Sequence, residues 1–161
     1  MVDKDHNRKY SELVGIKNEG GIMKISTKGR YALRIMIDLA MNVDKGPIRV
    51  KDIASRQNIS EKYLEQIIAM FNKAGYVKSV RGAQGGYLLS MDVEEYTAGM
   101  ILRLAEGSIA PASCVGADAE NCEKKGACVS AMLWQKMNDA VNDVVDNTTL
   151  KDLVDWQNEI E

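Results

Sequence analysis

Apolar residues recur every three or four positions along most of this chain, which is the spacing of one face of an α-helix. The first such run follows Ser26, a residue type that caps helix N-termini, and it stops at the breaker stretch 44–47 ("DKGP"). Residues 1–22 lack this periodicity, so we expect a flexible leader there, with Met23 as a candidate true start. The buried side of the first helix is predicted to carry Ala32, Ile35, Met36, Leu39, Ala40 and Val43.

Two shorter helices are predicted next, separated by a tight turn at residues 57–60. Ser60 can cap the second of them, Glu61 stands favourably at its positive end, and Gly75 stops it. Two helices joined by so short a turn form a helix-turn-helix. The residues expected to face inward are Val50, Ile53 and Ala54 in the first helix and Leu64, Ile67, Ile68 and Phe71 in the second.

Two runs rich in strand-forming residues follow, at 76–80 and 86–90, with the glycine-bearing basic loop 81–85 between them. This pattern predicts a β-hairpin. A helix-turn-helix followed by a hairpin is the winged-helix arrangement. We therefore expect a winged helix-turn-helix DNA-binding domain over residues 23–91.

The region 92–161 is predicted to be helical apart from a loop at 107–128, which holds all three cysteines. Thr97 can open a helix before the loop, and a last helix is expected over 147–156. The long helix after the loop has apolar spacings of four and three, typical of a helix that packs against a partner. The predicted apolar positions are Ala98, Ile101, Leu102 and Ala105 before the loop, and Leu133, Met137, Ala140, Val141, Val144 and Val145 after it. The expected fold is mainly α with one small β-hairpin.

The charges divide between the two regions. Residues 23–90 hold 12 Lys and Arg against 5 Asp and Glu, whereas residues 91–161 hold 5 against 14. A basic half beside an acidic half indicates that only the first meets a polyanion, although uneven charge without consequence is the alternative. No apolar run approaches the ~18 residues of a membrane span and the N-terminus lacks a signal-peptide centre, so we expect a cytoplasmic protein with no membrane partner.

The second helix of a helix-turn-helix enters the major groove, so the polar side of the helix after Ser60 is the candidate reading face. Gln66 can hydrogen-bond adenine at two points, and Glu65 can accept from cytosine while it repels phosphate. Ser60 and Lys62 suit phosphates, and Tyr63 also lies near the helix start. An ordinary solvated helix face is the alternative.

Basic residues outside this helix extend the predicted DNA-binding set. Arg81 at the hairpin tip could enter a narrowed minor groove, and Gly82 lets that loop lie close to the DNA backbone. Lys28 and Arg30, at the start of the first long helix, are phosphate candidates that could equally be ordinary surface charges. No usable histidine, phosphate-cradling loop or framed pair of acids points to an enzyme.

The cysteines are spaced Cys114-x7-Cys122-x5-Cys128, which does not fit the short knuckles of structural zinc sites. Longer, loop-borne spacings are more usual around iron–sulfur clusters, which need four ligands in all. The fourth could be a histidine, a carboxylate or a group from a second subunit. His6 in the leader is a poor candidate, and Asp118, Glu120 and Glu123 are nearer. A metal or cluster site, a redox thiol switch and no function all remain open from the chemistry.

Four stretches together carry a resemblance: "MKISTKGRYALRIMIDLA", "ISEKYLEQI", "SVRGAQGGYLL" and "LWQKMNDAVNDVVDNTTLKDLV". From Met23 to about Trp156 the chain resembles a bacterial family of winged helix-turn-helix regulators typified by the iron–sulfur cluster regulator IscR and the cysteine-metabolism repressor CymR. The resemblance implies a homodimer held by the long helix after the cysteines, on a partly palindromic double-stranded DNA operator. We expect this regulator to act as a repressor.

The resemblance also implies roles for particular residues. Ser60, Lys62, Tyr63, Glu65 and Gln66 stand where such proteins read the major groove, and Arg81 and Gly82 stand where the wing meets the minor groove. In the IscR-like branch three cysteines, here Cys114, Cys122 and Cys128, hold a 2Fe–2S cluster. The CymR-like branch lacks this trio and senses cysteine supply through a complex with a cysteine-synthesis enzyme.

Two departures from the IscR pattern concern the cluster. The first cysteine gap is longer than usual, and the position of the IscR-like histidine ligand is Ala131 here. Some related nitric-oxide sensors take an acidic ligand from the partner's first helix, but Arg30 occupies that neighbourhood. The resemblance therefore implies a cluster whose fourth ligand is unidentified.

Overall fold

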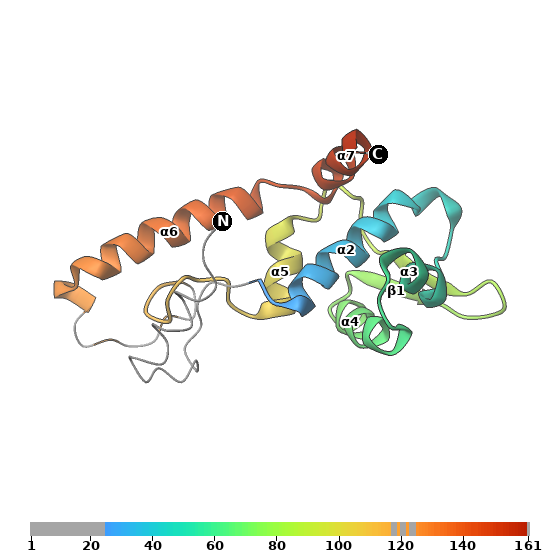
Figure 1. Cartoon of the computed structure of the whole chain (residues 1–161), viewed down its shortest axis with the longest axis horizontal. Coiled ribbons are helices and arrows are strands. Elements are labelled where there is room, and N and C mark those ends of the chain that lie inside the picture. Colours follow the sequence, from blue (N-terminus) through green and yellow to red (C-terminus); the bar gives the residue numbers. More distant parts are fainter. Residues whose placement is uncertain (1–24, 117–118, 120–121, 123–124, 161) are drawn as a thin grey trace, which may run out of the picture.

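The computed structural model describes residues 25–116, 119, 122 and 125–160, so the predicted leader and Met23 lie outside it. Helix α2 (Thr27–Met41) is followed by a 3-10 turn η1 (Val43–Lys45), α3 (Val50–Gln57) and α4 (Glu61–Lys73). The hairpin consists of β1 (Val77–Val80) and β2 (Gly86–Leu89). Then come α5 (Ala98–Glu106), a second 3-10 turn η2 (Lys125–Ala127), α6 (Val129–Asp146) and α7 (Leu150–Ile160). The mainly helical fold with one hairpin is as predicted (Figure 1).

Helix α2 is the centre of the molecule, because it packs against α3, α4, α5, α7 and β2. Ser26 caps it as predicted, since the Ser26 hydroxyl accepts a hydrogen bond from the Gly29 amide at 3.2 Å. The predicted inward positions Ala32, Ile35, Met36, Leu39 and Ala40 are all buried. The prediction for Val43 is wrong: α2 ends at Met41, and Val43 lies in η1 with 47% of its surface exposed.

Helices α3 and α4 form the predicted helix-turn-helix. Asn58 makes the turn between them in the left-handed conformation (φ 52°), which asparagine tolerates better than most residues. The Ser60 hydroxyl accepts a hydrogen bond from the Tyr63 amide at 3.4 Å and caps α4. The predicted inner residues of α4, Leu64, Ile67, Ile68 and Phe71, are buried together with Ile53 and Ala54 of α3.

The hairpin is antiparallel, with Val77 opposite Leu89 and Val80 opposite Gly86. A third segment joins it: Ile48 and Tyr87 exchange two backbone hydrogen bonds at 2.9 and 2.8 Å. This approach requires glycine at position 86, because a Cβ there would stand 2.3 Å from the Ile48 carbonyl oxygen. The wing is thereby tied to the chain segment that opens α3.

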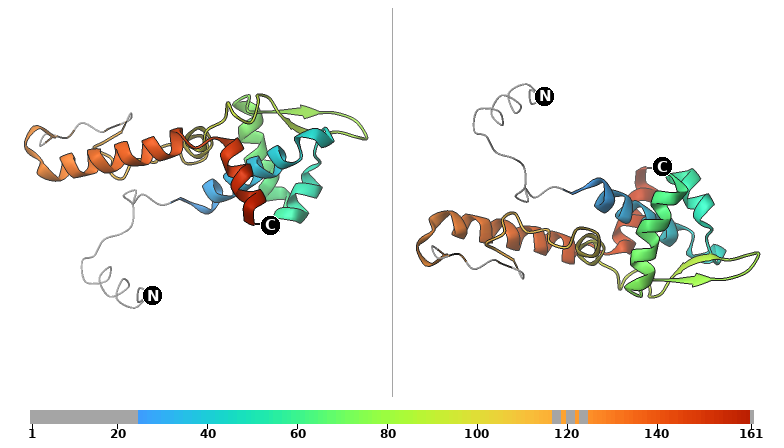
Figure 2. Two further views of the ribbon diagram at one scale, coloured as in Figure 1. Left: turned by 90° about the horizontal axis from the view of Figure 1, so that it is seen from above. Right: turned by 90° about the horizontal axis from the view of Figure 1, so that it is seen from below.

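Helix α6 extends away from the other helices, and the hairpin projects at the opposite end of the molecule (Figures 1 and 2). Asn138 is its one buried residue within the described part of the chain, while Val129 and Val144 are 80% and 64% exposed. The last helix begins at Leu150, three residues later than predicted, because Asn147 caps the end of α6. None of the helices in the described residues combines the length and hydropathy of a membrane span.

Tyr96 joins the hairpin to the start of α5. Its buried hydroxyl donates to the Tyr76 carbonyl at 2.6 Å and accepts from the Ser90 and Met91 amides at 2.9 and 3.0 Å. Burial raises the pKa of this phenol above its ordinary value. The hydroxyl therefore satisfies three backbone groups at once.

We expect Tyr96→Phe to lower the free energy of unfolding by about 1–3 kcal/mol, because it removes three hydrogen bonds and leaves the part-buried Met91 amide without its acceptor, whereas the Ser90 amide keeps its bond to the Tyr76 carbonyl. Urea unfolding followed by circular dichroism measures this change. Tyr87→Phe is the matched control, since the Tyr87 hydroxyl has no hydrogen bond to the described residues and should change stability little. Equal losses in the two variants would contradict this role for Tyr96.

Candidate nucleic-acid interface

The outward side of α4 is polar. Lys62, Glu65 and Gln66 are exposed, and Ser60 is exposed at the cap. None of these three α4 side chains has a hydrogen bond or ion pair to another described residue. Their functional groups are therefore available to an external partner along the first two turns of the helix.

Tyr63 differs from these neighbours because it is half-buried. Its ring packs edge-on against the ring of Tyr31 on α2, with centroids 5.9 Å apart. The Arg34 guanidinium lies 5.5 Å from the centroid of the same Tyr31 ring. Tyr63 thus fixes the start of α4 against α2 as well as bordering the polar face.

The first turn of α2 carries the other two basic candidates. Lys28 and Arg30 are both exposed, and Arg30 donates to the Thr27 hydroxyl at 3.0 Å. Arg30 therefore points along its own helix turn rather than into a site with acidic ligands.

The wing presents Arg81 and Gly82 to solvent, and Gly82 has a φ of 113°, which favours glycine. Arg49, which the sequence analysis did not single out, holds this tip. Its guanidinium donates to the Ala83 carbonyl at 2.9 Å and to the Gln84 side chain at 3.2 Å. Its position directly after the strand-like Ile48 is the only local signal, because the contact spans 34 residues.

A second group that the sequence analysis missed lies behind the helix-turn-helix. The Asp38 carboxylate is 3% exposed and accepts two hydrogen bonds from Arg56, at 2.6 and 3.0 Å, and one from Gln57 at 2.9 Å. Arg34 in turn donates to the side chain and backbone carbonyl of Gln57 at 3.0 and 2.7 Å. An aspartate beside the apolar stripe of α2 is a signal for a buried carboxylate, but the sequence does not name its partners. It fixes the end of α3, where the turn into α4 begins.

The three cysteines are free thiols with different surroundings. Cys114 and Cys128 are half-buried, Cys122 is exposed, and Cys128 stands at the N-cap of α6. Among the described residues, no three histidine, cysteine, aspartate or glutamate side chains lie close enough together to hold a metal ion. His6, Asp118, Glu120 and Glu123 lie outside the described residues. Three thiols fit an iron–sulfur cluster in donor type, but this structure does not gather them.

Helix α5, which leads into the cysteine loop, is hydrogen-bonded to both α2 and α6. Glu106, immediately before the loop, accepts hydrogen bonds from the amide and hydroxyl of Ser26 at 2.9 and 2.7 Å. On the same helix, Arg103 donates to the Asp146 carboxylate at 2.6 and 2.8 Å and to Asn142 at 2.7 Å. The guanidinium of Arg103 lowers the pKa of Asp146. Helix α5 therefore contacts the start of α2 and the end of α6.

Comparison with known proteins places this architecture in a family. The profile of the Rrf2 family, described as an iron-dependent transcriptional regulator, matches residues 25–156. The chain is 46% identical over 134 residues to the regulator CymR of Bacillus subtilis, covering 83% of this chain and 91% of that protein. It is 39% identical over 132 residues to the regulator IscR of Pectobacterium atrosepticum, covering 82% and 79%.

Comparison with solved structures finds the same two kinds of regulator. The structure of CymR, the global cysteine regulator of B. subtilis, superposes with a TM-score of 0.69 at 46% identity, over 83% of this chain and 97% of that one. The structure of T. potens IscR superposes with a TM-score of 0.70 at 39% identity, over 86% and 90%. The relatives are regulators rather than enzymes. The exposed polar helix and its wing thus belong to a DNA-binding transcriptional regulator, and the chain is a member of the Rrf2 family.

Proposed function

We propose that this protein is a dimeric operator-binding repressor that reads DNA with α4 and the wing, and that its cysteine loop controls the binding. The observation that carries the proposal is the outward face of α4, where Lys62, Glu65 and Gln66 are exposed and unpaired within the described chain. In this proposal residues 23–91 bind DNA, and residues 92–161 sense and dimerise.

Each residue of the proposed DNA-binding surface has a distinct task. Gln66 and Glu65 read base edges in the major groove, while Ser60 and Lys62 contact phosphates. Tyr63 orients the start of the helix through Tyr31. Arg81 and Gly82 meet the minor groove, and Lys28 and Arg30 contact the backbone. Arg49 keeps the wing in place by its bonds to Ala83 and Gln84.

Dimerisation through α6 is supported by its exposed apolar residues. In a single chain these apolar side chains are exposed to water along a helix of 18 residues. An exposed apolar helix face of this length favours association with a partner. The two copies would place two reading helices on the two halves of a palindromic operator. The exposed apolar residues are Val129, Met132, Leu133, Met137 and Val144.

For the effector, we propose a 2Fe–2S cluster held by Cys114, Cys122 and Cys128, with the fourth ligand unidentified. Such a cluster supplies reactivity toward oxygen and nitric oxide and sensitivity to iron scarcity. To bind it, the loop must bring three separated thiols together, so its conformation must change. Because Glu106 precedes the loop and Cys128 opens α6, that change acts on helices at both ends of the loop.

A second candidate is control without a cluster, by thiol oxidation or by a partner enzyme of cysteine synthesis. It is favoured by the 46% identity to CymR and by the separation of the three thiols in this structure. In this case the acidic region would bind the partner, and the cysteines would be incidental or would act as redox groups.

The reading face can be tested with paired substitutions on α4. We expect Gln66→Ala to cost about 1–3 kcal/mol of discrimination at one base position, because Gln66 reads a base edge. Lys62→Ala should weaken all sequences alike and reduce the salt slope by about one, because it removes a phosphate contact. Binding-site selection and salt titrations with the dimer distinguish these outcomes. A uniform loss of affinity from both substitutions would show that the reading face is misassigned.

The cluster can be tested by isolating the protein without oxygen. We expect visible charge-transfer absorption with matching iron and sulfide, and its loss in the Cys114→Ser, Cys122→Ser, Cys128→Ser triple variant. Operator affinity should then differ between the loaded and metal-free wild type but not in the variant. A colourless, iron-free protein would exclude the cluster, and regulation that survives in the triple variant would favour the partner enzyme.

The route from the loop to α2 can be tested at Glu106. Glu106→Ala removes the acceptor of two Ser26 hydrogen bonds, so amide exchange at Gly29 and Arg30 should accelerate. Operator affinity should fall several-fold, and it should depend less on the state of the loop. Glu94→Ala, which removes an exposed carboxylate with no hydrogen bond to the described residues, is the control. Unchanged exchange at Gly29 would show that Glu106 does not hold this helix end.

A further inference from the structure

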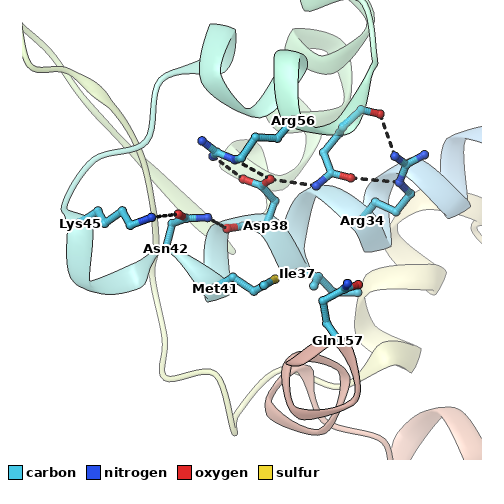
Figure 3. A pocket seen from close by; sticks show the side chains of 9 residues that line it. Arg34, Ile37, Asp38, Met41, Asn42, Lys45, Arg56 and Gln157 are labelled. Carbon is cyan, nitrogen blue, oxygen red and sulfur yellow. Dashed lines mark hydrogen bonds and ion pairs between the residues drawn. The ribbon is translucent and has the colours of Figure 1, made fainter. Parts of the chain in front are cut away.

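An open cavity of about 550 Å³ lies on the side of the helix-turn-helix that faces α7 (Figure 3). Its walls come from the second half of α2, from η1, from the end of α3 and from α7, which contributes Gln157. Cavities of roughly 300–1,000 Å³ hold small organic ligands. The proposed DNA-binding residues and the cysteines do not line it.

The charges around the cavity are mostly positive. Arg34, Lys45 and Arg56 line it, against a single carboxylate from Asp38. That carboxylate already accepts three hydrogen bonds, from Arg56 twice and from Gln57. A cationic ligand would therefore meet two uncompensated positive charges and an acceptor whose positions are largely taken.

The donors of the cavity exceed its own acceptors. An arginine has five N–H groups and a lysine three, and the hydrogen bonds found here use only part of them. Lys45 donates to Asn42 at 2.7 Å, and the Asn42 amide donates to the Asp38 carbonyl at 2.7 Å. The remaining N–H groups of Lys45, Arg34 and Arg56 suit the oxygens of carboxylates or phosphates, which form strong charge-assisted hydrogen bonds.

The far side of the cavity is less polar. Ile37 and Met41 lie between the Asp38 network and Gln157 of α7, as Figure 3 shows. They offer a short apolar wall, and the Gln157 amide completes the opposite side. The ligand that fits this lining is a small organic anion with more than one acidic oxygen group and a short carbon skeleton.

We propose that this cavity is a binding site for such a multivalent organic anion. Arg34, Lys45 and Arg56 hold the acidic groups, and Ile37 and Met41 contact the carbon skeleton. The same arginines bind Gln57 and Asp38, so a ligand here rests directly on the group that fixes the end of α3. Occupancy would therefore stiffen the end of α3, where the turn into α4 begins.

The test uses the full chain without DNA, so its outcome is independent of the proposed operator binding. Citrate, pyrophosphate and inorganic phosphate are titrated by calorimetry and by side-chain amide NMR. We expect citrate to bind at least tenfold more tightly than phosphate and to shift the amide signals of Asn42 and Gln157. Tighter binding of pyrophosphate, which has no carbon skeleton, than of citrate would contradict the roles given to Ile37 and Met41.

The variant Lys45→Gln should weaken binding about tenfold, because it removes one charge-assisted hydrogen bond to the ligand. Lys45 is exposed, so its substitution should not impair folding. Lys78→Gln removes the same charge from the exposed side of β1 and should leave binding unchanged. Equal weakening by both variants would show that binding depends on the overall positive charge of the protein and not on this cavity. No binding of any probe at millimolar concentration, or shifts confined to other amides, would overturn the site.

Discussion

The apolar side of α2 is the surface against which the rest of the chain folds. Helices from both regions pack on it, α3 and α4 from the basic region and α5 and α7 from the acidic one. Burying one helix side against four partners leaves little freedom to move any of them alone, because packed interiors transmit displacement. It also forces Asp38 into the interior, where a lone carboxylate would be very costly. The Arg56 and Gln57 hydrogen bonds offset that cost, so the polar network is a condition of the packing.

The charge division of the chain does not follow this packing. The basic residues 23–90 and the acidic residues 91–161 share one hydrophobic core, which contains Tyr96, Ile101 and Leu150 beside the α2 residues. Hydrogen bonds cross the same boundary at Ser26 and Glu106 and at Tyr76 and Tyr96. Charge therefore divides the surface of the chain, while the interior remains common to both regions. A change in the acidic region can reach α3 and α4 through this shared core.

Periodicity in the sequence was enough to predict the helices, the turn and the hairpin, because the buried positions of a helix or strand recur at a fixed spacing. Helix caps were predictable because a capping side chain bonds a backbone amide only two or three residues away. Ser26, Ser60 and Thr97 all cap the helices expected of them. The prediction for Val43 was wrong because the apolar spacing continues past the residue at which the helix ends. The contacts of Arg49, Asp38 and Glu106 could not be predicted, since they join residues 18 to 80 positions apart. The cysteines illustrate another limit: their spacing identifies candidate donors but does not show whether the three thiols lie together.

The attachment of α6 gives it the properties of a lever. Its end is held near α5 by Arg103 and by the bond from the Ala98 amide to the Thr148 carbonyl at 2.8 Å. Its 18 residues extend about 27 Å from that pivot, so a tilt of roughly 10° displaces the Cys128 end by about 5 Å. In the proposed dimer, the two α6 helices would tilt together and change the separation of the two α4 helices. Half-sites on B-DNA recur every ~34 Å. A displacement of a few ångströms at the end of α6 would therefore move the two α4 helices away from the spacing of the half-sites.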